Sequence, residues 1–236
     1  MGNLQHLNLK HVYRTGDDDL FTDFYQKVLT NAIRYDRAVG YFSSSILAAN
    51  LSGLGSLIKT NGNMRLIIGH PLDPEEFNAL KSTSDISDEL SKKFSNKLIE
   101  FIESGIDLSE KRLELLAILV ASNRLEIKFA FRRAGMYHEK IGIVYDDREN
   151  IVVFQGSANE TPSGMFEHLN AESISVYKNW EHELFKAYGN TYLLGFEKLW
   201  KGEQKNTYVI DIQSDFYKKV ASYVRENETI SKLSPE

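Results

Sequence analysis

The sequence contains no cysteine, no long apolar run and no excess of positive charge. Without cysteine the chain cannot form disulfides, use a thiolate as a nucleophile or bind zinc through sulfur, and this lack fits a reducing compartment. No apolar run approaches the roughly 18 residues of a membrane-spanning helix, and the first residues show no basic segment followed by an apolar core. We therefore expect a cytoplasmic protein that does not bind a membrane.

Hydrophobic residues make up 42% of the 236 residues, which is enough for a substantial core. We expect one catalytic domain over residues 1–200 and a helical extension or linker over 201–236. The alternation of helical and extended apolar patterns predicts an α/β fold in which helices flank a mixed β-sheet.

Apolar spacing and polar turns predict the positions of the helices and strands. The predicted helices cover residues 20–33, 46–59, 90–102, 113–120, 181–200 and 215–225. The predicted strands cover residues 37–42, 64–68, 125–131, 137–145, 151–159, 173–177 and 208–212. The first two strands are joined through a helix, which predicts that they are parallel.

Polar residues gather on two neighbouring predicted strands. His138 and Lys140 are two residues apart on the first strand, so their side chains point to the same face. By the same alternation Ser157 and Asn159 share a face at the end of the second strand. A short polar turn joins the two strands into a hairpin, so the four groups can converge.

An imidazole, an ammonium group, a hydroxyl and an amide suit the cleavage of a phosphodiester. A neutral imidazole can attack phosphorus, an ammonium group can neutralise the non-bridging oxygens, and the other two groups can bind those oxygens. Glu172, on the third apolar run, could orient the imidazole by accepting its second N–H. None of these roles needs a metal ion or another cofactor.

Three short motifs, taken in order, resemble the signature of the phospholipase D superfamily. They are His138-x-Lys140, Gly156-Ser157-x-Asn159 and Glu172. The resemblance covers roughly residues 34–200, and it implies a phospholipase D-like fold, a phosphohistidine intermediate and hydrolysis without a metal. It also implies an active site made from two copies of the motif, in which one histidine attacks and the other protonates the leaving oxygen.

Two shorter fragments resemble one subgroup of that superfamily. They are Gly40-Tyr41-Phe42-Ser43 and Ile68-Gly69. The subgroup is the nuclease domain of bacterial restriction-type enzymes, which often precedes a DEAD/DEAH-type helicase. This resemblance implies DNA as the substrate, and a helicase or a DNA-recognition domain or subunit as a partner.

The sequence departs from the family pattern at one structural position. The family usually has an aspartate five residues after the lysine, but this chain has Tyr145 there and Asp146 one residue later. A one-residue shift along a strand reverses the face of the side chain. Asp146 can therefore take that place only if the strand bulges or has already ended.

The chain also carries only one copy of the histidine motif. Of its six histidines, only His138 is followed by a lysine two residues later. If two histidines are needed, a second copy of the chain must supply the other one across a two-fold axis. We therefore predict a homodimer.

The formal net charge of −5 is unusual for a nuclease, because surfaces that bind phosphate are usually basic. Local charge can differ from the total, and a group of cations precedes the histidine strand. These cations are Arg124, Lys128, Arg132 and Arg133. Arg132 and Arg133 are candidates for binding substrate phosphate; the alternative is that all four are solvated positions.

A metal-dependent site is the main chemical alternative. His138-Glu139 begins like a zinc-protease motif, but the position four residues after His138 is Gly142 instead of a second histidine. The aspartates at 17–19 and 146–147 could bind magnesium, although carboxylates clustered in turns are usually solvated. We predict that the site holds no metal.

The leading hypothesis is a metal-independent DNA endonuclease of restriction or phage-defence type. His138 would be the nucleophile, Glu172 would orient it, and Lys140, Ser157 and Asn159 would bind the phosphate. Three alternatives remain open: a phospholipase D-type hydrolase, an RNase of the same superfamily, and a non-catalytic domain for dimerisation or nucleic-acid binding. No amphipathic membrane-surface helix stands out, so a lipid substrate is less favoured.

Overall fold

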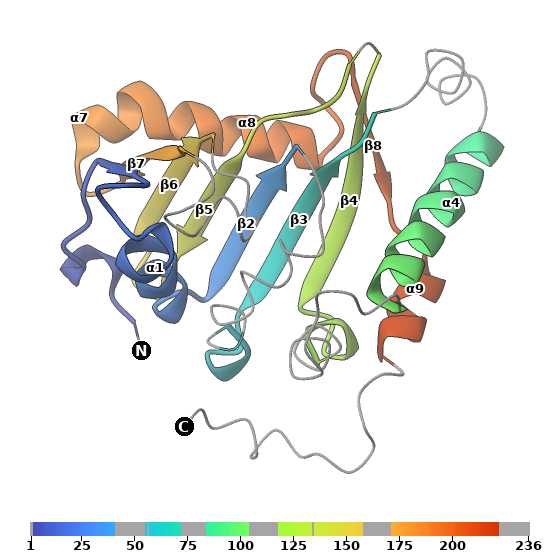
Figure 1. The fold of residues 1–236 in the computed structure, drawn as a ribbon, viewed down its shortest axis with the longest axis horizontal. Helices are drawn as coiled ribbons and strands as arrows, with labels where there is room; N and C mark the ends of the chain where they lie inside the picture. Colours follow the sequence, from blue (N-terminus) through green and yellow to red (C-terminus); the bar gives the residue numbers. More distant parts are fainter. Residues whose placement is uncertain are drawn as a thin grey trace.

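One mixed sheet of eight strands forms the centre of the computed structural model (Figure 1). The structure describes residues 2–40, 55, 57–71, 84–103, 118–133, 135–157 and 171–221. The strands are β1 (Val12–Arg14), β2 (Arg34–Val39), β3 (Asn63–Gly69), β4 (Leu125–Arg132), β5 (Ile141–Tyr145), β6 (Ile151–Gly156), β7 (Ser173–Lys178) and β8 (Thr207–Asp211). Their order is β1-β7-β6-β5-β2-β3-β4-β8, in which β2, β3 and β4 are parallel and the other neighbours are antiparallel.

Helices cover both faces of the sheet, so the predicted α/β class is confirmed. They are η1 (Leu4–His6), η2 (Leu20–Tyr25), α1 (Gln26–Thr30), α4 (Ser84–Glu103), α7 (His182–Leu184), η3 (Phe185–Gly189), α8 (Asn190–Trp200) and α9 (Ser214–Ala221). On one face the core includes side chains of η2, α1, α4 and α9, and on the other α8 contributes Phe196 and Leu199. None of the helices in the described segments is long and apolar enough to cross a membrane.

The C-terminal strand and helix belong to the same sheet and layers. β8 pairs with β4, and α9 packs near α4. Residues 207–221 of the expected extension therefore continue the fold that begins in the first 200 residues. The short strand β1, which pairs with β7, was not predicted because three residues are too few to show an alternating pattern.

The strand β2 begins at Arg34, three residues before the predicted start. Its first residues were not predicted to be part of a strand because they include charged side chains. Asp36 is fully buried and accepts hydrogen bonds from Arg34 (Nη2 to Oδ2, 2.6 Å) and Arg65 (Nη2 to Oδ2, 2.7 Å). Both arginines also contact Glu197 of α8, and Arg34 Nη2 lies 3.1 Å from its Oε1. This ion cluster attaches α8 to the sheet.

The β5–β6 hairpin is present, but both strands are shorter than predicted. Ile141 pairs with Gln155, so β5 begins four residues after the expected start at Tyr137. β6 ends at Gly156, and Ser157 lies just beyond it. Side-chain alternation therefore does not decide where the motif residues outside the two strands point.

Asp146 holds the turn that follows β5. Its Oδ2 accepts hydrogen bonds from the backbone N–H of Leu4 (2.8 Å) and the side chain of Asn150 (2.8 Å), and its Oδ1 accepts from the backbone N–H of Arg148 (2.8 Å). Because β5 ends at Tyr145, the one-residue shift does not turn this carboxylate to the wrong face. Asp146 therefore has a structural role: it joins the turn to the beginning of the chain.

Replacing Asp146 should destabilise the protein, most strongly near neutral pH. Asp146→Ala leaves the buried N–H of Leu4 and the part-buried donors of Arg148 and Asn150 without their acceptor, so the free energy of unfolding should fall by about 2–4 kcal/mol at pH 7. Burial by itself would raise the pKa of Asp146, but its hydrogen bonds, first that from Asn150 and then those from Leu4 and Arg148, outweigh burial and lower it. Urea unfolding between pH 3 and pH 7 measures both effects.

A carboxyl group with a lower pKa in the folded state stabilises the fold above its unfolded pKa, which is about 3.9, and loses this contribution as the pH falls through the folded pKa. The wild type should therefore lose stability below about pH 4, and Asp146→Ala should lose part of that pH dependence. Asp147→Ala, at the exposed neighbouring position, is the control. Equal unfolding midpoints of wild type and Asp146→Ala at pH 7 would contradict this role.

Candidate active site

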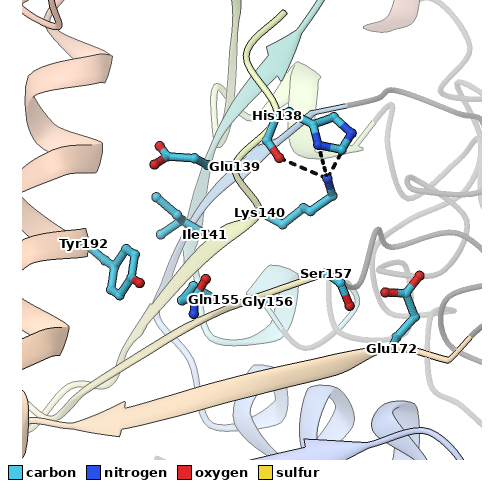
Figure 2. A pocket seen from close by; sticks show the side chains of 9 residues that line it. All are labelled: His138, Glu139, Lys140, Ile141, Gln155, Gly156, Ser157, Glu172 and Tyr192. Atoms are coloured by element: carbon cyan, nitrogen blue, oxygen red, sulfur yellow. Dashed lines mark hydrogen bonds between the residues drawn. The ribbon is translucent and has the colours of Figure 1, made fainter.

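A cavity of about 570 Å³ lies where β6 ends and where β5 and β7 begin (Figure 2). Its lining contains four of the five residues that the sequence predicts to be catalytic. The lining residues are His138, Glu139, Lys140, Ile141, Gln155, Gly156, Ser157, Glu172 and Tyr192. The volume is within the usual range for sites that bind small ligands.

Two glycines let the segment that carries His138 cross the ends of β2 and β3. A Cβ atom on Gly69, the last residue of β3, would lie 2.1 Å from the carbonyl oxygen of Tyr137. A Cβ atom on Gly40, next after β2, would lie 2.6 Å from the Cα of His138. These glycines belong to the two fragments that resemble the restriction-type subgroup; residues 41–43 of the first fragment lie outside the described residues.

His138 and Lys140 contact each other directly. The Lys140 Nζ lies 3.0 Å from His138 Nδ1 and 3.2 Å from Nε2, and it donates a hydrogen bond to the His138 carbonyl oxygen at 2.9 Å (Figure 2). An ammonium group only donates and a neutral imidazole has one accepting nitrogen, so at most one of these two contacts is a hydrogen bond to the ring. A lone pair on that ring is what nucleophilic attack requires.

Lys140 is buried at the edge of this cavity, with 6% of its surface exposed. Burial lowers the pKa of Lys140, and the nearby guanidinium of Arg37 lowers it further, while the carboxylate of Glu172 acts in the opposite direction. The folded protein thus holds a desolvated cation beside another one. A bound phosphate anion would add negative charge beside Lys140 and so favour its charged form.

Hydrogen bonds fix the backbone of Ser157 just after the end of β6 and that of Glu172 just before the start of β7. The backbone N–H of Ser157 donates to the Ser173 carbonyl oxygen (3.1 Å), and that of Ser173 donates to Ser157 Oγ (3.2 Å). The N–H of Glu172 donates to Thr15 Oγ1 (2.8 Å), and its carbonyl oxygen accepts from the Thr15 N–H (3.0 Å). Hydrogen bonds therefore hold the Ser157 hydroxyl and the backbone of Glu172 at these strand ends.

The strands β6 and β7 approach closely at Gly156. A Cβ atom there would lie 2.0 Å from the Ser173 carbonyl oxygen, so only glycine fits this position. Ser157 follows directly and lines the cavity. The glycine of the Gly-Ser-x-Asn motif thus has a packing reason; Asn159, the last residue of that motif, lies outside the described residues.

The structure does not bring the candidate phosphate-binding arginines to the cavity. Arg132 and Arg133 lie at the end of β4, which β2 and β3 separate from β5. Lys128 stands over the ring of Trp200 at 4.8 Å and pairs with Asp211, and Arg124 bonds to the Ile58 carbonyl oxygen and to Asn61. These cations do not form a continuous track to His138.

Apart from Gly156, which belongs to the Gly-Ser-x-Asn motif, four residues of the lining were not predicted from the sequence. They are Glu139, Ile141, Gln155 and Tyr192. Glu139 and Ile141 flank Lys140 in the sequence, but the expected alternation of side chains places them on the opposite face, so it gave no signal that they line the same cavity. Tyr192 comes from α8, and no local pattern connects that helix with the motifs.

Of the histidines in the described ranges, only His138 lines the cavity. His11 lies 3.5 Å from Glu181, and the ring of His70 packs on Phe94. His168 lies outside the described residues. Within the described part of the chain, no three His, Asp or Glu side chains are grouped so that they could hold a metal ion.

No protein-family model matches the chain, and no curated protein matches it. Among solved structures, polyphosphate kinase from Porphyromonas gingivalis is similar with a TM-score of 0.47 and 10% identity, over 89% of this chain and 25% of that chain. Phosphatidylserine synthase from Haemophilus influenzae is similar with a TM-score of 0.46 and 14% identity, over 91% of this chain and 45% of that chain. Nuc, a phospholipase D family member from Salmonella typhimurium, is similar with a TM-score of 0.43 and 13% identity, over 86% of this chain and 97% of that chain. The chain spans a quarter of the first of these proteins and less than half of the second.

Gly40→Ala should impair the site more than the fold. The new methyl group must displace His138, and a displacement of about 1 Å at a reacting group lowers kcat by about 100-fold. Gly195→Ala, in helix α8 with open space around the new methyl group, is the matched control. Cleavage rates and melting temperatures of both variants test this, and a Gly40→Ala protein with wild-type kcat would contradict it.

Lys140→Met should separate activity from stability. Losing the buried cation removes transition-state charge stabilisation, so the cleavage rate should fall by about 100–1,000-fold. The melting temperature should rise by about 2–4 °C, because the costly cation beside Arg37 is gone. Lys178→Met is the control: Lys178 is equally buried, but it bonds to the Leu9 carbonyl oxygen and pairs with Glu181, so its loss should lower stability and leave activity unchanged. A marked loss of stability in Lys140→Met would contradict the prediction.

Proposed function

We propose that the chain is a metal-independent phosphodiesterase of phospholipase D type, and that it cleaves DNA as a homodimer. The observation that carries this proposal is the contact between the Lys140 ammonium group and the His138 ring, within a cavity that Ser157 and Glu172 also line. Nucleophile, cation, hydroxyl and carboxylate are the groups that phosphoryl transfer through a histidine needs. Asn159 completes the proposed set of phosphate ligands.

The reaction proceeds in two displacements. The His138 lone pair attacks phosphorus, the P–O bond to the leaving group breaks, and the leaving oxygen takes a proton from a second histidine. Water then attacks the phosphohistidine, the second histidine accepts its proton, and the P–N bond breaks. Lys140 and Ser157 stabilise the charge on the non-bridging oxygens in both steps, and Glu172 holds the imidazole orientation.

The second histidine is supplied by His138 of the partner subunit. The single His-x-Lys motif per chain supports this, as does the position of the other histidines in the described ranges, which do not line the cavity. The cavity lies at the end of the sheet, where a two-fold axis can bring two such motifs face to face. A restriction-type or phage-defence nuclease, working with a helicase or a DNA-recognition domain, is the biological setting that the short resemblance supports.

Substrate assays with and without a chelator separate this function from its alternatives. Cleavage of DNA that continues in excess EDTA supports the proposal. Faster cleavage of RNA selects the RNase alternative, and faster cleavage of phosphatidylcholine selects the phospholipase D-type hydrolase. Binding of DNA without cleavage of any substrate selects the non-catalytic domain. Loss of all activity in chelator, with recovery on addition of magnesium alone, would overturn the metal-independent mechanism.

A mixing experiment tests the shared site. When wild type and His138→Ala are refolded together in equal amounts, only about a quarter of the dimers contain two wild-type chains. A site that needs both histidines should therefore retain about a quarter of the activity of the same total protein, whereas independent sites retain about half. His138→Ala alone should be inactive.

His182→Ala is the matched control, because His182 is exposed on α7 and does not line the cavity. Mixtures with this variant should keep full activity. A strict monomer in sedimentation that still cleaves DNA would contradict the shared site. A His138→Ala protein as fast as the wild type would contradict the nucleophile itself.

A further inference from the structure

The cavity has two chemically different halves. The phosphate half contains His138, Lys140, Ser157 and Glu172, and the α8 half contains Glu139, Ile141, Gln155 and Tyr192. Figure 2 shows Tyr192 and Glu172 on opposite sides of the cavity. Ile141 belongs to the core cluster under α8, so the α8 half lies on the α8 face of the sheet. A phosphodiester bound at His138 would extend one of its two ester groups into this half.

Tyr192 is the inner end of a stack of three tyrosine rings. The ring of Tyr177 lies between the other two, with centroids 6.0 Å from Tyr192 and 5.8 Å from Tyr188 and interplanar angles of 19° and 21°. Tyr188 is 55% exposed, so the stack runs from solvent to the cavity. Parallel rings form a surface on which another flat ring can stack, and base–aromatic stacking contributes about 1–3 kcal/mol per base.

Polar groups beside Tyr192 match the edge of a nucleobase. The Gln155 amide can both donate and accept, and the Glu139 carboxylate can accept from an exocyclic amino group. Burial, and then the neighbouring Tyr177 and Glu139, raise the pKa of Tyr192, so its hydroxyl stays protonated and can donate. The negative charge of Glu139 disfavours a second phosphate in this half.

We propose that the α8 half is a nucleobase subsite, in which an unpaired base next to the scissile phosphate stacks on Tyr192. This inference rests on the proposed phosphodiesterase function and narrows its substrate to single-stranded or flipped-out nucleotides. A paired base within a duplex cannot present its face to Tyr192 and its edge to Gln155 and Glu139. A choline headgroup would also suit a carboxylate and an aromatic ring, but sites for quaternary ammonium enclose the cation in a cage of rings. The three rings here are parallel instead.

The test compares two single-stranded oligonucleotides, one with normal bases and one with abasic residues on both sides of the cleaved phosphates. Wild-type kcat/KM should be about 5–150-fold lower on the abasic strand, as the loss of one stacked base predicts. Tyr192→Leu should lower kcat/KM on the normal strand by the same factor and leave the abasic strand unchanged. Tyr192→Phe, which keeps the ring, should retain most of the preference.

Tyr208→Leu is the matched control, because Tyr208 is half-buried on β8, at the opposite edge of the sheet. If Tyr192→Leu proves much less stable than this control, Glu139→Gln provides the second test. It should lower the preference for adenine and cytosine over thymine, because the carboxylate no longer accepts from their amino groups.

The outcomes distinguish the subsite from the underlying chemistry. Equal wild-type cleavage of the normal and abasic strands would overturn the subsite and leave the phosphodiesterase proposal intact, and so would faster cleavage of a duplex than of a single strand. Faster cleavage of phosphatidylcholine vesicles than of either strand would reassign the α8 half to choline. Failure to cleave any of these substrates, with no difference between wild type and His138→Ala, would overturn the phosphodiesterase itself.

Discussion

The candidate site depends on the close passage of residues 137 and 138 over the ends of β2 and β3. Glycine at positions 40 and 69 is required there, since a Cβ atom at either position would overlap the crossing segment. Because of this passage, His138 lies outside β5, at the edge of the sheet. There the Lys140 ammonium group contacts the His138 ring and donates a hydrogen bond to its carbonyl oxygen. The His138 residue is thus held by close backbone contact with Gly40 and by hydrogen bonding to the buried Lys140 ammonium group.

Local sequence patterns predicted the mixed sheet, the parallel pairing of β2 with β3 and most of the helices, because alternation and helical spacing are properties of neighbouring residues. They failed where charge or crossing geometry decided the structure. The charged start of β2 was not assigned to a strand because its burial depends on Arg65 and Glu197, which are distant in sequence. Residues 137–140 were assigned to a strand although they bridge the sheet edge, and Tyr192 could not be connected with the motifs without the packing of α8.

The electrostatics of the cavity differ from the net charge of the chain, which bears on the anionic substrate proposed above. The chain carries a formal charge of −5, yet a desolvated lysine lines the cavity, and the buried Arg37 lies near enough to lower the pKa of that lysine. Such an arrangement is costly while the site is empty and favourable when an anion enters, which is typical of sites that carry out chemistry. The basic residues at the end of β4 are not needed for this local attraction.

The ion cluster of Asp36, Arg34, Arg65 and Glu197 joins the sheet to helix α8, and these two parts of the fold supply different walls of the cavity. The wall with His138 and Lys140 is continuous with the sheet, whereas Tyr192 belongs to a helix that the ion cluster attaches to the sheet. A lineage could therefore exchange the exposed turns of that helix, and Tyr192 with them, while keeping the cluster and the residues on the sheet. Chemistry and selectivity would then evolve as separate modules of one small cavity.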